Sequence, residues 1–582
     1  MNAPSRLRYS RDDRPPHLLA ALLGAQTVVL ILASITLTPL IVLQTAGDDA
    51  QAFASWLIFA ALLVSGIFTI IQARPIGPVG SGYLLFMGSS SAYIAIAVTA
   101  IQAGGLPLLG TLIICSALIQ FLFAARLSLL RRLVTPTLGG IVIMLISVSV
   151  FPIVFGMLTR APATMHHGEQ AALITALATF IVIAGMALFG RGPVRLWAPL
   201  FGVVVGMIVA WTFGMVDFSA MRAAPMLGLP DARWPGLDLS FSPVFWILLP
   251  GFLIVTVVGA LETYGDGVAV QRISHHQQRP TDYKAVQGAL YADGVGNMVA
   301  GLANTMPNTT YSIGISLTEL TGVTARRVGI YGGLILIMLA FSPKISVLLQ
   351  SIPGPVAGVY LMILLVLLFA HGLRLVTADG LSQDNALVIG LAFWLGMGFQ
   401  YQLLFRDLIP EWALTFADNG MTAGTVVAIL LTVLLALKRR VPNKIVLDPV
   451  ASSVPSLHDF LRRLGRTQDW SSRTIGRLEL VAEEAFMFLL ENAGPSSAKM
   501  RRVYCWARQD SNMLELELLI TESGRSNLEQ VITELREQPN EPGRDTIGPT
   551  LLKQLTTELR HLQFHDADCL MVKLTLDPAP VR

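Results

Sequence analysis

Long apolar runs recur along the chain up to about residue 438, and they constrain its fold more than any other feature. Each run holds roughly 18–22 residues, which as a helix spans about 30 Å, the thickness of the hydrocarbon core of a bilayer. The composition agrees, because 53% of the 582 residues are hydrophobic and only 14% are charged. The sequence therefore predicts an integral membrane protein and excludes a soluble protein of several domains.

Hydropathy divides residues 17–438 into about fourteen segments that are long enough to cross a bilayer. Their predicted bounds are 17–43, 53–72, 82–102, 107–126, 134–156, 170–189, 195–214, 243–270, 284–303, 307–323, 328–348, 355–373, 385–402 and 420–438. We therefore expect an all-α polytopic membrane domain over 17–438.

Two of these segments, 82–102 and 307–323, are weak, because Gly, Ser, Thr and Pro interrupt them. They hold the third place in two successive sets of seven segments, about 17–214 and 243–438. Paired broken segments in corresponding positions indicate an inverted repeat with a binding site where the two repeats meet. The alternative is that both are ordinary helices with loose ends.

Lys and Arg are concentrated in alternate loops, such as "QRISHHQQRPTDYK" and the loop that ends in Lys438-Arg439-Arg440. By the positive-inside rule these loops and both termini lie in the cytoplasm, which predicts a multi-pass protein of the inner, plasma membrane. Residues 1–16 have no small-residue cleavage site after a short apolar run. We therefore interpret them as a cytoplasmic N-terminal segment and not as a removed signal peptide.

The character of the chain changes near Val441, where charges begin to alternate with apolar residues. Residues 439–582 are enough for one further domain of about 140 residues on the cytoplasmic side. "DWSSRTIGRLELVAEEAFMFLLENA" and "GPTLLKQLTTELRHL" predict helices, whereas "RRVYCWARQ", "MLELELLITES" and "CLMVKLTL" predict strands. We expect an α/β sandwich. The three cysteines, Cys115, Cys505 and Cys569, have neither metal-ligand spacing nor the number for a disulfide framework.

Carboxylates inside the predicted spans are candidate functional residues, because an ionised group is costly in hydrocarbon. Glu262 leads, and Asp266 follows at i+4 on the same helix face. Since burial disfavours the charged form, we expect both residues to be candidates for proton coupling, and a protonated Glu262 to donate a hydrogen bond to a ligand. The alternative for either is a structural carboxylate. We favour a structural role for Asp293, and a gate or a salt bridge with Arg326 for Glu319.

The polar clusters "GSSSAYIA" (88–95) and "PNTTYSIG" (307–314) interrupt the two weak segments. Extended backbone is tolerated at membrane depth only where it is buried in protein or lines a cavity. We expect two short extended pieces that pair with each other and aim the N-termini of the following helices at one point. Backbone N–H groups at a helix start bind an acceptor-rich ligand without a charged side chain.

At these residues the sequence resembles the nucleobase–ascorbate transporter family, the uracil/xanthine permeases with a seven-plus-seven inverted repeat. The likeness covers about 15–438, and it rests on "LGAQTVVL", "MGSSSAYIAIA", "TPTLGGIVIMLISVSVFPIVF", "ALETYGDGVAV", "ADGVGNMVAGLANTMPNTTYS" and "LTGVTARRVG". The resemblance implies that Glu262 binds the base and that Gln26, Ser91 and Ser312 line the site. It also implies alternating access between a core bundle and a gate bundle, and a homodimer.

The sequence departs from this family at three positions of the site. Thr27 stands where the family has a histidine after Gln26. After the Thr-Thr-aromatic-Ser, where the family has Gln or Glu followed by Asn-x-Gly, this chain has Ile313 and Gly314. A site that reads a base through a carboxamide or carboxylate loses discrimination without it, so the substrate itself is not predicted.

The C-terminal domain resembles anti-sigma-factor kinases, which have the histidine-kinase-like ATPase fold. "LVAEEAFMFLLENAG", "LLITESGRS" and "IGPTLLKQLTTELRHL" carry the likeness. Glu484 aligns with the helix Glu, whereas the Mg²⁺-ligating Asn falls on Phe488 and the adenine-reading Asp on Glu522. An apolar residue cannot ligate a hard cation. We therefore expect no cofactor and a degenerate regulatory domain; the alternative is a generic α/β domain.

Three functions remain open on the sequence. The leading interpretation is proton-coupled symport of a nucleobase or similar small heterocycle. The second is transport of another small anion, as in the related sulfate/bicarbonate branch, and the third is a membrane sensor that signals through its C-terminal domain. A small molecule, a proton, the bilayer, a second copy and a cytoplasmic regulatory protein are the expected partners, and nucleic acid is not. An enzyme is disfavoured, since the sequence has no nucleophile–base or metal constellation.

Overall fold

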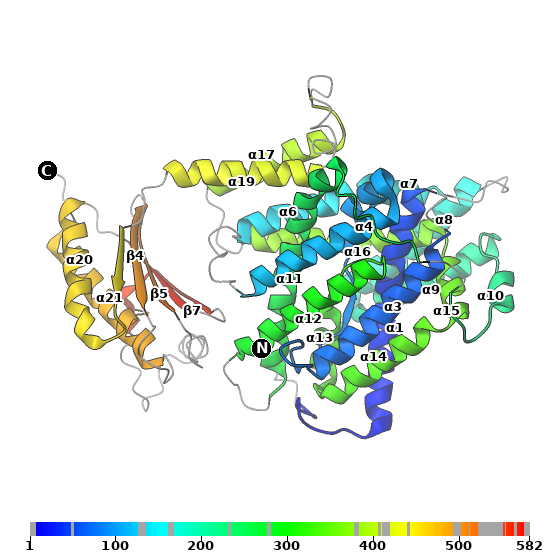
Figure 1. The fold of residues 1–582 in the computed structure, drawn as a ribbon, viewed down its shortest axis with the longest axis horizontal. Helices are drawn as coiled ribbons and strands as arrows, with labels where there is room; N and C mark the ends of the chain where they lie inside the picture. Colours follow the sequence, from blue (N-terminus) through cyan, green and yellow to red (C-terminus); the bar gives the residue numbers. More distant parts are fainter. Residues whose placement is uncertain are drawn as a thin grey trace. The chain divides into compact units, whose positions relative to one another are not determined.

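The structure is a computed structural model, drawn in Figure 1. It describes residues 7–47, 52–125, 136–160, 168–230, 234–275, 281–377, 383–404, 409, 420–438, 443–468, 470–492, 502–510, 513–521, 551–552, 554–563 and 567–575. Residues up to 431, apart from two short segments, form one compact unit, and residues 432–582 belong to a second. The boundary between the units therefore falls within helix α19 (Gly420–Lys438).

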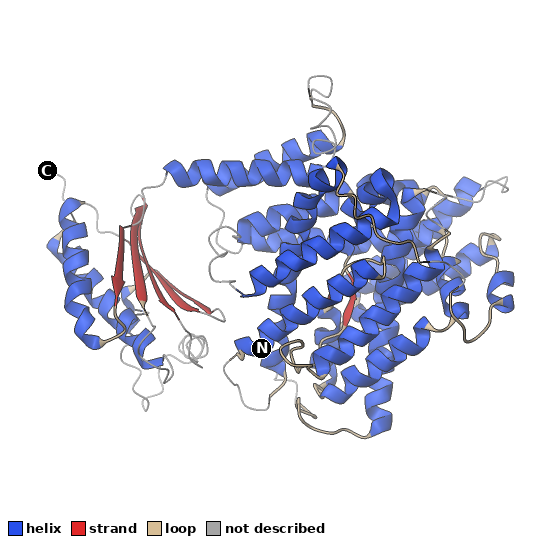
Figure 2. Ribbon diagram, in the orientation of Figure 1, coloured by secondary structure: helices blue, strands red, loops and turns tan. Residues whose placement is uncertain are grey.

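The first unit is built almost entirely of helices (Figure 2). Among the described residues, eight stretches are helical, long and apolar enough to cross a membrane, and the bent pair α14–α15 is a ninth candidate. The helices are α1 (His17–Ala46), α3 (Ala54–Ala73), α4 (Ile94–Ala125), α6 (Pro136–Ser149), α7 (Phe151–Leu158), α8 (Gly168–Phe189), α9 (Pro193–Thr212), α10 (Ser219–Ala223), α11 (Pro243–Ile273), α12 (Tyr283–Leu302), α13 (Ser312–Thr321), α14 (Arg326–Ala340), α15 (Pro343–Gln350), α16 (Gly354–Thr377), α17 (Gln383–Gln400) and α19. The prediction of a mostly helical polytopic unit is confirmed.

Two predicted span boundaries differ from the structure. Helix α4 joins the predicted third and fourth segments across a kink at Gly104 and Gly105, where Gly105 has φ +73°. This left-handed conformation strains residues with a Cβ, so glycine suits it. The predicted span 328–348 is instead two helices, α14 and α15, bent by 81°. Pro343 begins α15, and a proline is tolerated there because the first helical N–H has no partner within the helix.

The two weak segments contain the short strands β1 (Met87–Ser89) and β2 (Asn308–Thr310). They pair antiparallel, with Gly88 opposite Thr309, and every residue of both strands is buried. The pairing expected from the polar clusters is therefore confirmed. β1 leads through the short helix η1 (Ser91–Tyr93) into α4, and β2 leads into α13.

Small residues let the helices of the first unit approach closely, as is usual where helices pack in a membrane. A Cβ added to Gly24 of α1 would lie 2.8 Å from the backbone N of Gly332 on α14. A Cβ on Gly140 of α6 would lie 2.6 Å from the carbonyl oxygen of Gly372 on α16. Larger residues at these crossings would push the helices apart.

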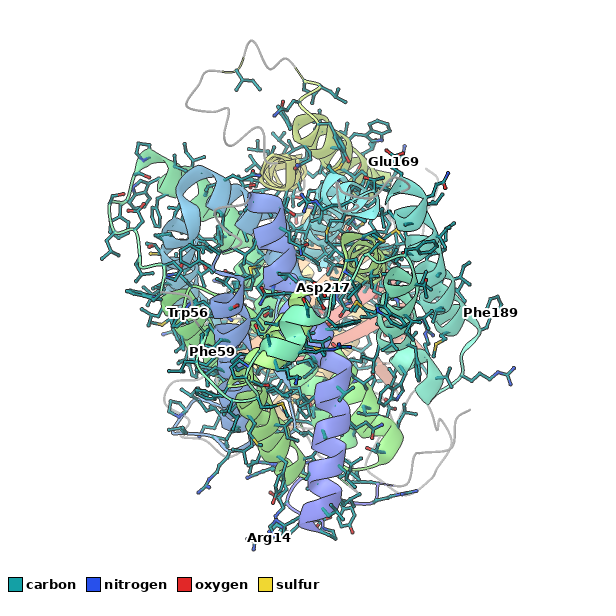
Figure 3. The ribbon with its side chains drawn as sticks, turned by 90° about the vertical axis from the view of Figure 1, so that its right-hand side faces the viewer. Arg14, Trp56, Phe59, Glu169, Phe189 and Asp217 are labelled. Carbon is teal, nitrogen blue, oxygen red and sulfur yellow. The ribbon has the colours of Figure 1, made fainter. Side chains whose placement is uncertain are left out.

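Large apolar side chains are exposed on the outer helices, as expected for a surface that faces lipid. Phe189 at the end of α8 is 85% exposed, and Figure 3 shows it at the outer edge of the unit. Trp56 and Phe59 project side by side from α3 in the same view, with ring centroids 5.8 Å apart. The Trp56 Nε1–H donates to the carbonyl of Ala303, at 2.8 Å. A polar handle on an apolar ring is typical of membrane proteins near the interface.

The second unit contains an antiparallel sheet with the strand order β3-β4-β5-β7-β6 and two helices. The strands are β3 (Asn443–Leu447), β4 (Val503–Asp510), β5 (Met513–Thr521), β6 (Glu558–Gln563) and β7 (Ala567–Thr575), and the helices are α20 (Val454–Thr467) and α21 (Ser472–Asn492). Apolar residues of α20 and α21 pack with inward-facing residues of the strands in one core. The expected α/β arrangement is present, and β3 and α20 were not predicted.

One predicted helix of this unit is wrong at its C-terminal end. The residues "ELRHL", expected to end the helix "GPTLLKQLTTELRHL", belong to strand β6. It pairs with β7 along its whole length, and Lys573 Nζ contacts Glu558 Oε2 at 2.8 Å. Pairing with a neighbouring strand thus overrides the local helix propensity.

Candidate substrate site

Asp266 of α11 joins that helix to the junction between β2 and α13. Its Oδ2 accepts a hydrogen bond from Thr310 Oγ1 at 2.7 Å, and its Oδ1 accepts one from Ser312 Oγ at 2.7 Å. The side chain is buried. Both carboxylate oxygens thus accept bonds from hydroxyls that the polar cluster supplies. The geometry makes Asp266 the residue that positions the start of α13.

Glu262 lies one helical turn before Asp266, on the same face of α11. It is half-buried and forms no hydrogen bond or ion pair with the described residues. Its nearest charged or titratable neighbours include Asp266, Asp293 and Tyr311, with which it interacts electrostatically. Its carboxyl group therefore has no partner among the described residues, whereas both oxygens of Asp266 already accept a hydrogen bond.

A second buried carboxylate, Asp293 of α12, forms part of a polar network. Its Oδ2 accepts from Gln120 Nε2 of α4 at 2.8 Å and from Thr263 Oγ1 of α11 at 3.2 Å. Asp293 Oδ1 has no partner among the described residues. These local bonds are what a structural role requires, in line with the prediction for this residue.

The same network continues to strand β2. Gln120 Oε1 accepts from Asn297 Nδ2 at 3.2 Å, and Asn297 Oδ1 accepts from the backbone N of Asn308 at 2.6 Å. Sequence reasoning missed Gln120, Thr263 and Asn297. The signal was present, because each is a polar side chain within a predicted span, and such groups need a hydrogen-bond partner in a membrane.

Tyr311, the residue before α13, ties the two strands together. Its backbone N donates to the Phe86 carbonyl at 2.9 Å, and its hydroxyl donates to the Ser89 carbonyl at 2.7 Å. Its ring lies against Gly88, where an added Cβ would be 2.5 Å from Tyr311 Cε2. The close approach of ring and strand therefore requires glycine at position 88. No side chain caps the start of α13.

The remaining predicted site residues divide into two groups. Gln26 on α1 and Ser91 in η1 are half-buried, and neither side chain has a hydrogen bond with the described residues. Ile313 instead packs with an apolar cluster from α1, α3 and α14, and a Cβ on Gly314 would lie 3.2 Å from Phe86. The structure thus brings together Glu262, Asp266 and Ser312. It places Ile313 and Gly314 against apolar neighbours.

For Glu319 a gate or a salt bridge with Arg326 was expected, and the salt bridge is not formed among the described residues. Arg326 Nη2 lies 3.1 Å from Asp12 Oδ1, and Glu319 is exposed without an ion pair there. The N-terminal segment explains the difference, because Arg11 donates its backbone N–H to Ser274 and accepts one from Arg326. This segment thus supplies the carboxylate, which the sequence did not indicate.

The second unit offers a poor fit to nucleotide and Mg²⁺. Phe488, which the expected resemblance places at the metal-ligating position, is 5% exposed and packs in the core of the unit. It offers no oxygen to a cation that prefers oxygen ligands. Glu484 lies on α21, and Glu522 lies outside the described residues. The residue at the metal-ligating position therefore does not fit the group. In the described ranges of the whole chain, no cluster of three His, Cys, Asp or Glu residues could hold a metal.

A protein-family model and several known permeases match most of the chain. A model of the Permease family matches residues 19–404. The chain is 29% identical over 445 residues to the xanthine permease XanP of Escherichia coli K12, which covers 74% of this chain and 95% of XanP. It is 26% identical over 436 residues to the putative purine permease CPE0397 of Clostridium perfringens, covering 75% and 94% respectively.

Among solved structures, the transmembrane domain of the cyanobacterial bicarbonate transporter BicA aligns with 73% of this chain and 100% of its own. The identity is 16% and the TM-score is 0.46.

Proposed function

Because the chain belongs to the nucleobase–ascorbate transporter family, we propose that it is a secondary active transporter that carries a nucleobase together with protons. Xanthine, uracil and related purines are the first candidate substrates, since the aligned relatives are named as xanthine and purine permeases. The observation that carries the proposal is the half-buried carboxyl of Glu262, which has no partner among the described residues. Both oxygens of the neighbouring Asp266, in contrast, accept a hydrogen bond.

In the proposed mechanism Glu262 binds both the proton and the base. Protonation from the outside lets its hydroxyl donate a hydrogen bond to an acceptor on the heterocycle, and neutralises a charge that is costly in a dry site. Loss of the proton on the other side removes that donor and weakens binding. Asp266 holds Ser312 and Thr310 in place, so that backbone N–H groups at the start of α13 face the ligand. Gln26 and Ser91 complete the proposed site.

We place this chemistry in a seven-plus-seven inverted repeat, about 17–214 and 243–438, that alternates access by moving a core bundle against a gate bundle. The strand pair, formed by one segment from each repeat, supports this placement. Both termini, including residues 1–16, would lie in the cytoplasm, with the protein in the cell's inner membrane as a homodimer.

Residues 439–582 are proposed to be a cytoplasmic regulatory domain of histidine-kinase-like fold that has lost nucleotide binding. Phe488 in its core supports this, because restoring a magnesium ligand there would bury an amide among apolar side chains. Its ligand would then be another protein. Purified protein should show no thermal shift with ATP and Mg²⁺, and a clear shift would contradict the proposal.

Uptake of radiolabelled xanthine and uracil into cells that lack their own permeases tests the proposed function. We expect uptake by the natural chain and its loss in Glu262→Gln, which keeps the size of the side chain but cannot release a proton. Glu169→Gln is the matched control, because Glu169 is exposed in the first turn of α8 (Figure 3). Full uptake in Glu262→Gln would refute its role. Transport that small anions compete for, and bases do not, would favour an anion carrier.

A further inference from the structure

Helix α1 contains a proline where it packs against strand β1. Pro39 has no backbone N–H, so the carbonyl of Ile35, four residues earlier, has no partner within the helix. Ser89 Oγ of β1 donates to this carbonyl at 2.9 Å. This hydrogen bond, to the carbonyl that Pro39 leaves without a helical partner, links strand β1 to α1 at Ile35.

The residue before it, Ser34, attaches the same point of α1 to a different helix. Its hydroxyl is hydrogen-bonded to the hydroxyl of Tyr360 on α16. Tyr360 is 2% exposed, and it lies in the same apolar cluster as Leu37 of α1 and Val356 of α16. A hydrogen bond between two hydroxyls in such surroundings is worth more than one in water, and breaking it leaves both groups without a partner.

The two helices belong to different packing groups, defined by their main neighbours. Helix α16 packs mostly against α6, α7 and α8, whereas α1 packs mostly against α3, α4 and α14; helix α9 contacts both. The Ser89 carbonyl in turn accepts a hydrogen bond from the hydroxyl of Tyr311, the residue that follows strand β2. A continuous path of contacts thus leads from α16 through Ser34, Ile35 and Ser89 to the strand pair.

We propose that Tyr360 is a positioning residue that latches the α16 group of helices to the strand pair through Ser34. The bond holds the described state, and it must break when one group moves past the other. The proposal rests on the proposed function only in assigning that movement to transport. Loss of one such hydrogen bond is expected to shift the ratio of the two states by about fivefold.

Distance measurements between spin labels test the latch in purified full-length protein without substrate. Labels are placed at Leu22→Cys on α1 and Leu367→Cys on α16, which are 59% and 55% exposed, after replacing the three native cysteines by alanine. We expect Tyr360→Phe to increase a second distance population about fivefold. Ser34→Ala should have the same effect, and the double variant should add nothing, because both substitutions break one bond.

Tyr331→Phe is the matched control. It also removes a tyrosine hydroxyl bond, to His17 Nδ1 at 2.6 Å, but between α14 and α1, which belong to one packing group. Its distances should equal those of the parent protein. Unchanged distances in both Tyr360→Phe and Ser34→Ala, or an equal change in Tyr331→Phe, would overturn the latch. Since no substrate is used, failure of nucleobase uptake would not affect this outcome.

Discussion

Strands β1 and β2 occupy corresponding places in the two predicted repeats, yet they do different work. On β2 the Thr310 side chain bonds to the Asp266 carboxylate, and the backbone N–H of Asn308 donates to Asn297 Oδ1. On β1 the Ser89 hydroxyl donates to a backbone carbonyl of α1, and Gly88 lies against the Tyr311 ring. Strand β2 therefore contacts a buried carboxylate, whereas β1 is attached to α1 and packs against the ring.

The largest effect is expected from Asp266→Ala, which removes the carboxylate that strand β2 contacts. It leaves the Thr310 and Ser312 hydroxyls without their acceptor, and we expect the free energy of unfolding to fall by about 3 kcal/mol. Asp266→Asn should cost less, because the amide oxygen still accepts one bond. Denaturation of the purified protein in detergent measures both, and equal stability of Asp266→Ala and the natural chain would contradict the account.

Gly88→Ala tests the close packing of strand β1 against the Tyr311 ring. The new Cβ would be 2.5 Å from the Tyr311 ring and 2.8 Å from Ile35, so the ring must move and the bond from Tyr311 to Ser89 must lengthen. Overpacking of this kind costs about 1–3 kcal/mol. Gly156→Ala on α7 is the control, because nothing lies within 4 Å of its added Cβ. Equal changes in the free energy of unfolding for the two substitutions would contradict the expected overpacking at Gly88.

Neighbouring threonines of β2 give the sharpest contrast. Thr310→Val removes the bond to Asp266 and should cost about 1–3 kcal/mol. Thr309 is equally buried, but its Oγ1 has no partner among the described residues. Thr309→Val should therefore be neutral or stabilising, by up to about 1 kcal/mol. Thermal unfolding of the two variants side by side measures the difference, and a larger loss in Thr309→Val would reverse the argument.

The smallest effect is expected from Tyr311→Phe, which links the strands. It removes one hydroxyl bond to the Ser89 carbonyl while the ring keeps its place against Gly88. A loss of about 1 kcal/mol follows. Combined with Gly88→Ala, the two losses should not add, because the alanine already displaces the ring. Additive losses in the double variant would show that the ring and the hydroxyl act separately.

Much of the membrane unit could be predicted from the sequence. The apolar runs located most helices, and the polar clusters predicted both strands and their pairing, because backbone at membrane depth must find partners. Glu262 and Asp266 became candidates by the same reasoning, since a carboxylate in an apolar run stands out, and their roles remain predictions. The distinction between them was not available, because it depends on which one the hydroxyls of Thr310 and Ser312 reach.

The failures have a common physical cause. Asp12 pairs with Arg326 although they are far apart in the sequence, and Gln120 reaches Asp293 across two helices. Such contacts depend on how helices pack, which hydropathy does not report. Strand β6 was missed because its neighbour β7, and not its own propensity, decides its conformation.

We propose that Glu262 couples a proton to the movement of a nucleobase. Accumulation of labelled xanthine or uracil in proteoliposomes, driven by an imposed pH gradient, measures this most directly. We predict that the natural chain accumulates a base against its concentration gradient, that a protonophore abolishes the accumulation, and that Glu262→Gln shows none. Accumulation that survives the protonophore, or that Glu262→Gln matches, would contradict the claim.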